Sequence, residues 1–157
     1  NGTIDATEWV GPWNDERSRF YEAAKYYYWP GVHEPGTLIT RGCNKSWLTS
    51  LSKTDQLIIE HACTVQNELM LTEYNANNGA ALQRLVNEHG VELREFNEDV
   101  IDAMGAAAEE LYEDLSEGSE LTQRIVASFK KSRSEIRGWL KLADSAFFNQ
   151  RNRVLEG

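Results

Sequence analysis

Long apolar runs are missing from this chain of 157 residues. No stretch approaches the roughly 20 consecutive apolar residues of a membrane-spanning helix. No basic start leads into an apolar stretch, as it would in a secretory signal peptide. The GxSxG, Walker and GxGxxG patterns are missing as well. The sequence therefore offers neither the nucleophile elbow of a hydrolase nor a nucleotide-binding loop.

Cysteine is scarce, and histidine is not grouped. Cys43 and Cys63 form neither a disulfide framework nor a CxxC zinc motif. We expect both to be small buried apolar side chains. His61 and His89 lack partners at the spacing of metal ligands, so the sequence does not favour a zinc site.

Positive charge is in deficit: 16 lysines and arginines stand against 25 acidic residues, a net charge of -9. Such a surface repels phosphate groups, which argues against nucleic acid and anionic membranes as partners. The length suits one globular domain that buries a substantial core. We therefore expect residues 1–157 to be a single unit.

Proline occurs only within the first 35 residues, and the rest is rich in alanine, leucine and charge, as long helices are. The early segment predicts strands at 3–10 and 37–44 around a helix from 14 to about 27. Caps at Asn44, Ser52, Asn97 and Ser119 predict helices at 45–51, 53–89, 98–117 and 120–148, and the three longer helices carry stripes of apolar residues at helical spacing. Period-two alternation predicts a strand at 91–96. The fold class is α/β with excess helix.

The chain starts at Asn1, within sequence that reads like the interior of a strand. Three short strands do not easily make a self-sufficient sheet. We therefore expect a processed product or a piece of something longer, with further strands contributed by residues not present here.

Two short segments are candidate sites. Glu8 and Trp9 supply a carboxylate and a nearby main-chain carbonyl, hard oxygen ligands of the kind that Na⁺ or Ca²⁺ takes. The alternative is a surface glutamate beside a core tryptophan. In the turn at 33–36, His33 and Glu34 could orient a ligand or act as an acid–base pair, or simply be solvated. A metal-dependent hydrolase would need a third firm ligand that the sequence does not offer.

Three stretches together resemble a known family: residues 4–12 (IDATEWVGP), 20–28 (FYEAAKYYY) and 30–36 (PGVHEPG). They are similar to the solute-binding proteins of tripartite ATP-independent periplasmic (TRAP) transporters. The most similar subgroup binds 2-oxo acids and lactate, and its members are often labelled for mannitol or chloroaromatic compounds. The order and spacing match from Ile4 to Gly36, whereas the helical remainder is less diagnostic.

The resemblance implies an incomplete periplasmic-binding-protein-like lobe with long C-terminal helices, because family members are about twice this length and have two lobes. It implies a metal site in which Glu8 gives its carboxylate, Trp9 its carbonyl and Glu34 a second carboxylate to Na⁺ or Ca²⁺. Trp9 and Glu34 would also bind the substrate, a small 2-oxo or 2-hydroxy acid. No catalytic residues and no enzyme activity are implied.

The resemblance also implies membrane subunits of the transporter as partners, a periplasmic location and homodimers formed through C-terminal helices. The family's carboxylate-binding arginine and a glutamine of the cation shell precede residue 1, and neither Arg17, Arg19 nor Arg41 occupies that motif. This chain alone should hold an incomplete site. The alternative is a stand-alone helical self-association module with no small-molecule ligand.

Overall fold

The computed structural model describes residues 2–33 and 40–155. It divides into two compact units, Asn1–Asn97 and Glu98–Gly157. In the described parts of the chain, no helix is both long enough and apolar enough to cross a membrane.

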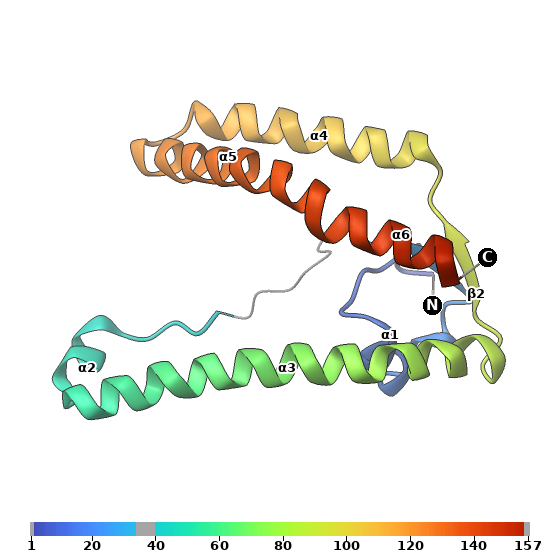
Figure 1. Cartoon of the computed structure of the whole chain (residues 1–157), viewed down its shortest axis with the longest axis horizontal. Coiled ribbons are helices and arrows are strands. Elements are labelled where there is room, and N and C mark those ends of the chain that lie inside the picture. The colour runs from blue at the N-terminus through green and yellow to red at the C-terminus, as the bar shows by residue number, and fades with distance from the viewer. Residues whose placement is uncertain (1, 34–39, 156–157) are drawn as a thin grey trace. The chain divides into compact units, whose positions relative to one another are not determined.

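The first unit is organised around one long helix. Helix α3 (Lys53–Asn87) follows the short helix α2 (Lys45–Ser50). Asn44 caps α2 by accepting a hydrogen bond from the Trp47 N–H, and Ser52 caps α3 through the Asp55 N–H. Both caps were predicted from the sequence and are confirmed. The short helix α1 (Pro12–Arg17) lies alongside α3 (Figure 1).

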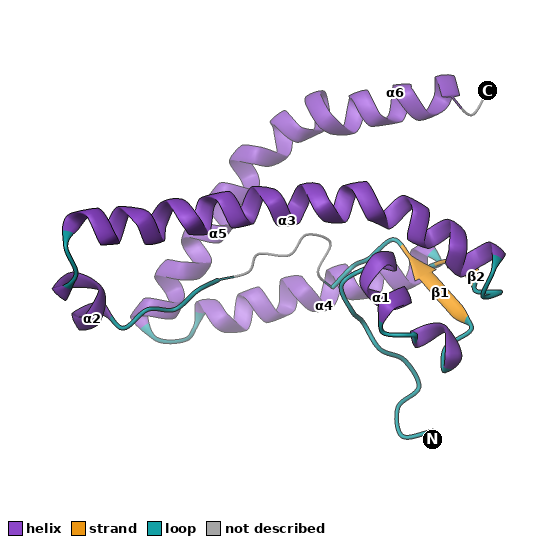
Figure 2. Cartoon of the chain, turned by 90° about the horizontal axis from the view of Figure 1, so that it is seen from below, coloured by secondary structure: helices purple, strands orange, loops and turns teal. Residues whose placement is uncertain are grey.

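The sheet of the described residues consists of two parallel strands, β1 (Tyr26–Trp29) and β2 (Glu92–Glu95), with Tyr26 opposite Glu92. Figure 2 shows β1 beside α1. The prediction of β2 is confirmed. The prediction of a helix up to residue 27 is wrong, because α1 ends at Arg17 and Arg19 takes a left-handed conformation with φ 58°. A 3-10 turn (Phe20–Glu22) then leads into β1.

Two further predictions about the early segment fail. Residues 3–10 are irregular, since no strand within the described residues lies beside them to pair with. Residues 40–44 are irregular as well, and 37–39 lie outside the described residues. Cys43 is exposed and Cys63 is half-buried. The prediction that both cysteines are buried is therefore wrong.

The second unit is a helical hairpin with a C-terminal extension. Helices α4 (Glu98–Ser116) and α5 (Glu120–Leu140) pack together, and Ser119 caps α5 through the Thr122 N–H. Arg133 of α5 pairs with Glu109 of α4. Beyond α5 the predicted helix widens into a π-helical turn (Lys141–Ser145) and continues as α6 (Ala146–Leu155).

Few apolar side chains are buried among the described residues. Ala81, Leu85 and Val91 form the core of the first unit, and Val126 is buried in the second. The predicted apolar stripes do fall on helices, but many of their side chains remain exposed. They include Ile58, Val65, Leu69, Leu121, Ile125, Phe129, Ile136 and Leu140.

Candidate functional site

The predicted ligands Glu8 and Trp9 lie in the irregular segment that precedes α1, and both are exposed. The Trp9 side chain is 55% exposed, with the edge of its ring against Phe20 at a centroid distance of 6.1 Å. The Thr7 hydroxyl donates to the Glu8 carbonyl at 3.3 Å. The segment therefore leaves the Glu8 carboxylate accessible, as a ligand-binding residue requires.

A sharp turn at Gly11 joins this segment to α1. Gly11 has φ 147°, a conformation that a residue with a Cβ rarely adopts. Pro12 then begins the helix, where its missing N–H is not needed. The Trp13 N–H donates to Oδ1 of Asn78 on α3 at 3.1 Å. The first N–H group of α1, that of Trp13, thus attaches the turn to α3.

Helix α1 is held against α3 by an ion pair and an aromatic contact. Nε and Nη2 of Arg84 donate to the two carboxylate oxygens of Glu16 at 2.6 and 2.7 Å. This bidentate pairing lowers the pKa of Glu16. The Trp13 and Tyr74 rings meet edge to face at 5.2 Å. These contacts fix α1, and with it the end of the turn at Gly11, against α3.

A second contact fixes α1 to the sheet. Asp15 is only 7% exposed, and the Tyr27 hydroxyl of β1 donates to its Oδ2 at 2.5 Å. Burial raises the pKa of Asp15 and outweighs the lowering by hydrogen bonds from Tyr27 and the Gly11 backbone, while the Glu8 carboxylate adds a smaller upward effect. Burial and Asp15 likewise raise the pKa of Tyr27.

The third predicted ligand, Glu34, lies outside the described residues, so the structure does not test whether it meets Glu8 and Trp9. Glu8 and Trp9 are brought together only as neighbours in sequence. His33 is exposed at the edge of the described segment. Across residues 2–33 and 40–155, no group of three His, Cys, Asp or Glu side chains could hold a metal ion by itself.

The residues present nevertheless suit a hard cation. In the described residues, no lysine or arginine forms an ion pair with Glu8. Its charge is felt at Asp15, whose pKa it helps to raise. An unpaired carboxylate, a main-chain carbonyl and a negative surrounding potential are what Na⁺ or Ca²⁺ prefers. Such an ion would require further ligands from elsewhere.

Sequence reasoning missed the residues that support this segment. It assigned no role to Asn78 and did not predict that Glu16 pairs with Arg84 or that Asp15 pairs with Tyr27. These contacts join positions up to 68 residues apart. Because no local pattern marks them, a single sequence gives no signal for them.

Comparisons with known proteins agree with the early motifs. The family model of the bacterial extracellular solute-binding proteins, family 7, matches residues 1–118. The chain is 31% identical over 148 residues to the monocarboxylate 2-oxoacid-binding periplasmic protein all3028 of Nostoc sp. strain PCC 7120. The aligned region covers 94% of this chain and 40% of the Nostoc protein.

Two solved structures are similar, both TRAP periplasmic solute-binding proteins. One, from Pseudoalteromonas atlantica T6c, has bound sodium and pyruvate. It is 32% identical with a TM-score of 0.82, covering 94% of this chain and 45% of that one. The other, from Colwellia psychrerythraea, has bound calcium and pyruvate. It is 33% identical with a TM-score of 0.83, covering 95% of this chain and 45% of that one.

This chain thus spans less than half the length of the relatives it matches. Over that span it has the fold of TRAP periplasmic solute-binding proteins, which confirms the predicted fold class and the resemblance. With three quarters of its residues matched by the family model, the chain belongs to family 7 of the bacterial extracellular solute-binding proteins.

Proposed function

We propose that this chain is the C-terminal portion of a two-lobe periplasmic protein that captures a small 2-oxo or 2-hydroxy acid together with Na⁺ or Ca²⁺. The main support is that two proteins about one third identical over nearly the whole chain hold pyruvate with one or the other of these ions. Glu8, accessible and without an ion-pair partner among the described residues, adds a suitable ligand beside the anchored turn at Gly11.

The proposed site combines Glu8, Trp9 and Glu34 with residues of the other lobe. Glu8, the Trp9 carbonyl and Glu34 would hold the cation, while Trp9 and Glu34 would also contact the acid. An arginine for the acid's carboxylate and a glutamine for the cation would come from sequence before residue 1. The cation neutralises the local negative charge when bound.

The proposed mechanism is capture without chemistry, so the protein is not an enzyme. Two lobes close on the acid and the cation, and the membrane subunits of the transporter receive the closed form. Ligand shifts the open–closed equilibrium only by its differential affinity for the closed state. Residues from both lobes give that difference, because the site is complete only when the lobes meet.

Isothermal titration calorimetry of the full-length protein tests the site. Pyruvate is titrated in NaCl or CaCl₂ into the wild type and into Glu8→Gln and Glu34→Gln. Losing a charged ligand should weaken binding by tenfold or more. Glu60→Gln is the matched control, since Glu60 is an exposed glutamate on α3. Unchanged affinity in both site variants would contradict the proposed residues.

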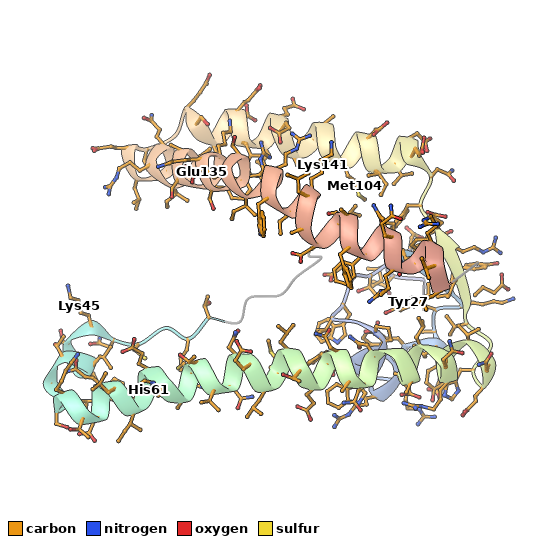
Figure 3. The ribbon with its side chains drawn as sticks, in the orientation of Figure 1. Tyr27, Lys45, His61, Met104, Glu135 and Lys141 are labelled. Atoms are coloured by element: carbon orange, nitrogen blue, oxygen red, sulfur yellow. The ribbon has the colours of Figure 1, made fainter. Side chains whose placement is uncertain are left out.

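We further propose a homodimer formed through the C-terminal helices. Trp139, Leu142 and Phe147 are 68%, 77% and 64% exposed. Figure 3 labels Glu135 on α5 and Lys141 in the π-helical turn of this region. A groove of about 630 Å³ runs beside Ile136 and Leu140. Exposed apolar surface of this kind is a common site of protein association.

Light scattering on the full-length protein tests the dimer, which should have twice the protomer mass across a range of concentrations. A monomer mass at every concentration would contradict it.

The same exposed surface favours the second candidate function, a helical self-association module without a small-molecule ligand. That candidate predicts a dimer that releases no heat with pyruvate in either salt.

A further inference from the structure

A buried carboxylate near the predicted ligands has no role in the proposed function so far. Asp15 is 7% exposed, and its Oδ1 is buried without a hydrogen-bond partner in the described structure. A carboxylate buried with half of its acceptor capacity unused lowers the stability of the fold. Its presence in α1 therefore points to a task other than stabilisation.

Asp15 is connected to the segment that carries the predicted ligands. The Asp15 N–H donates to the Gly11 carbonyl at 2.9 Å, in the first turn of α1. Only Val10 separates Gly11 from Trp9. The Gly11 turn is thus the point at which α1 meets the segment that carries Glu8 and Trp9.

The other side of this connection is the sheet. Tyr27, labelled in Figure 3, donates to Oδ2 of Asp15 and stands opposite Leu93 in the pairing of β1 with β2. The two contacts at Asp15 therefore link the Gly11 turn to the two-stranded sheet. Attachment to α3, through Trp13 and Asn78, fixes the same turn from a second element.

We propose that Asp15 and Tyr27 are a positioning pair that sets the turn at Gly11 and thereby aims the Glu8 carboxylate and the Trp9 carbonyl. The inference rests on the proposed function, since it assigns a task to residues behind that site. Neither side chain is proposed to touch the cation or the acid.

The test is the variant Tyr27→Phe in the full-length protein, because it removes the hydroxyl and keeps the ring. Pyruvate titrated in NaCl or CaCl₂ should bind about two- to tenfold more weakly, the range that one lost polar contact supports. Circular dichroism verifies folding. Val126→Ala, at a buried position of the second unit, is the control. It should lower the melting temperature and leave the affinity unchanged.

Two further variants separate positioning from a purely structural role. Asp15→Asn keeps an acceptor for the Tyr27 hydroxyl and should retain more affinity than Asp15→Ala. In a Glu8→Gln background, Tyr27→Phe should cost less affinity than in the wild type, because the pair acts through Glu8 and Trp9.

The outcomes distinguish the two proposals. If the wild type binds pyruvate, Glu8→Gln weakens it and Tyr27→Phe binds like the wild type, the positioning pair is refuted while the proposed function stands. If Tyr27→Phe does not fold, Asp15→Asn and Asp15→Ala decide, and equal affinity in both refutes the pair. A wild type that binds pyruvate in neither salt overturns the proposed function itself.

Discussion

Gly90 provides a sharp stability test of the fold that carries the site. It lies just beyond the end of α3 with φ 67°, and the Val91 N–H donates back to the Leu85 carbonyl at 2.9 Å. This left-handed residue turns the chain out of α3 so that β2 can pair with β1. A Cβ built on Gly90 would meet nothing within 4 Å. The cost of Gly90→Ala is therefore conformational and not steric.

The magnitude follows from two opposing contributions. The left-handed conformation costs an L-residue about 1–2 kcal/mol. Alanine restricts the unfolded chain more than glycine, which returns about 0.4–1 kcal/mol. We expect Gly90→Ala to lower the free energy of unfolding by about 1 kcal/mol. Gly90→Asn should cost less, because asparagine tolerates this conformation better than alanine.

Gly79 is the matched control. It lies exposed within α3, and a Cβ there would also meet nothing within 4 Å. Its helical backbone has no positive φ, so Gly79→Ala should raise the free energy of unfolding by about 0.5–1 kcal/mol. The same substitution thus has opposite effects at two open positions.

Urea denaturation followed by tryptophan fluorescence measures both variants. With an m-value of about 2 kcal/mol/M, the midpoint should move down by about 0.5 M for Gly90→Ala and up by about 0.25–0.5 M for Gly79→Ala. Equal midpoints for Gly90→Ala and the wild type would refute the left-handed turn. A loss above about 3 kcal/mol would show that the Cβ meets packed atoms.

Three predictions concern the core and the titrating groups of the first unit. Leu85 is only 2% exposed, so Leu85→Ala should lower the free energy of unfolding by about 2–5 kcal/mol in the same urea titration. Leu57 is 40% exposed, and Leu57→Ala should cost less than half as much. Arg84 lowers the pKa of Glu16 from 4.5, so this pair stabilises the fold above pH 4.5. The stabilisation is lost as the pH falls through the lowered pKa. The stability of Glu16→Gln should therefore approach that of the wild type in acid. The pKa of Asp15 is raised from 3.8, so its contribution has the opposite sign, and the wild type should lose stability relative to Asp15→Asn as the pH rises from 3.8. Urea midpoints measured from pH 3 to pH 7 check both signs.

Local signals predicted the later part of the fold well. The caps at Asn44, Ser52 and Ser119 each accept the hydrogen bond that their sequence position indicated. Strand β2 follows Gly90, and at its start the apolar Val91 and Leu93 alternate with the charged Glu92 and Arg94. In each case the determining residues lie within a few positions of one another, which is why the sequence alone was sufficient.

The early segment failed for the opposite reason. Tyr26 was assigned to a helix, but its main chain is paired with Glu92, 66 residues later. Residues 3–10 have a strand-like pattern and no partner strand among the described residues, so the pattern had nothing to pair with. A strand is a property of two segments, and its presence cannot be read from one of them.

Glu8 differs from the glutamates whose charges are paired within the fold. Glu16 pairs with Arg84 of α3 and Glu109 with Arg133 of α5, so their charges join one helix to another. Glu92 of β2 pairs with Lys25, just before β1. Glu8 has no such partner among the described residues, and its charge adds to that of a chain with net charge -9. An organic anion about 5 Å from one carboxylate would be repelled by roughly 3 kcal/mol at an effective dielectric constant of 20. A bound cation reverses the sign of that interaction for both charges at once. An exposed, unpaired glutamate that would be unfavourable for an acidic ligand alone therefore becomes favourable for the acid and cation together.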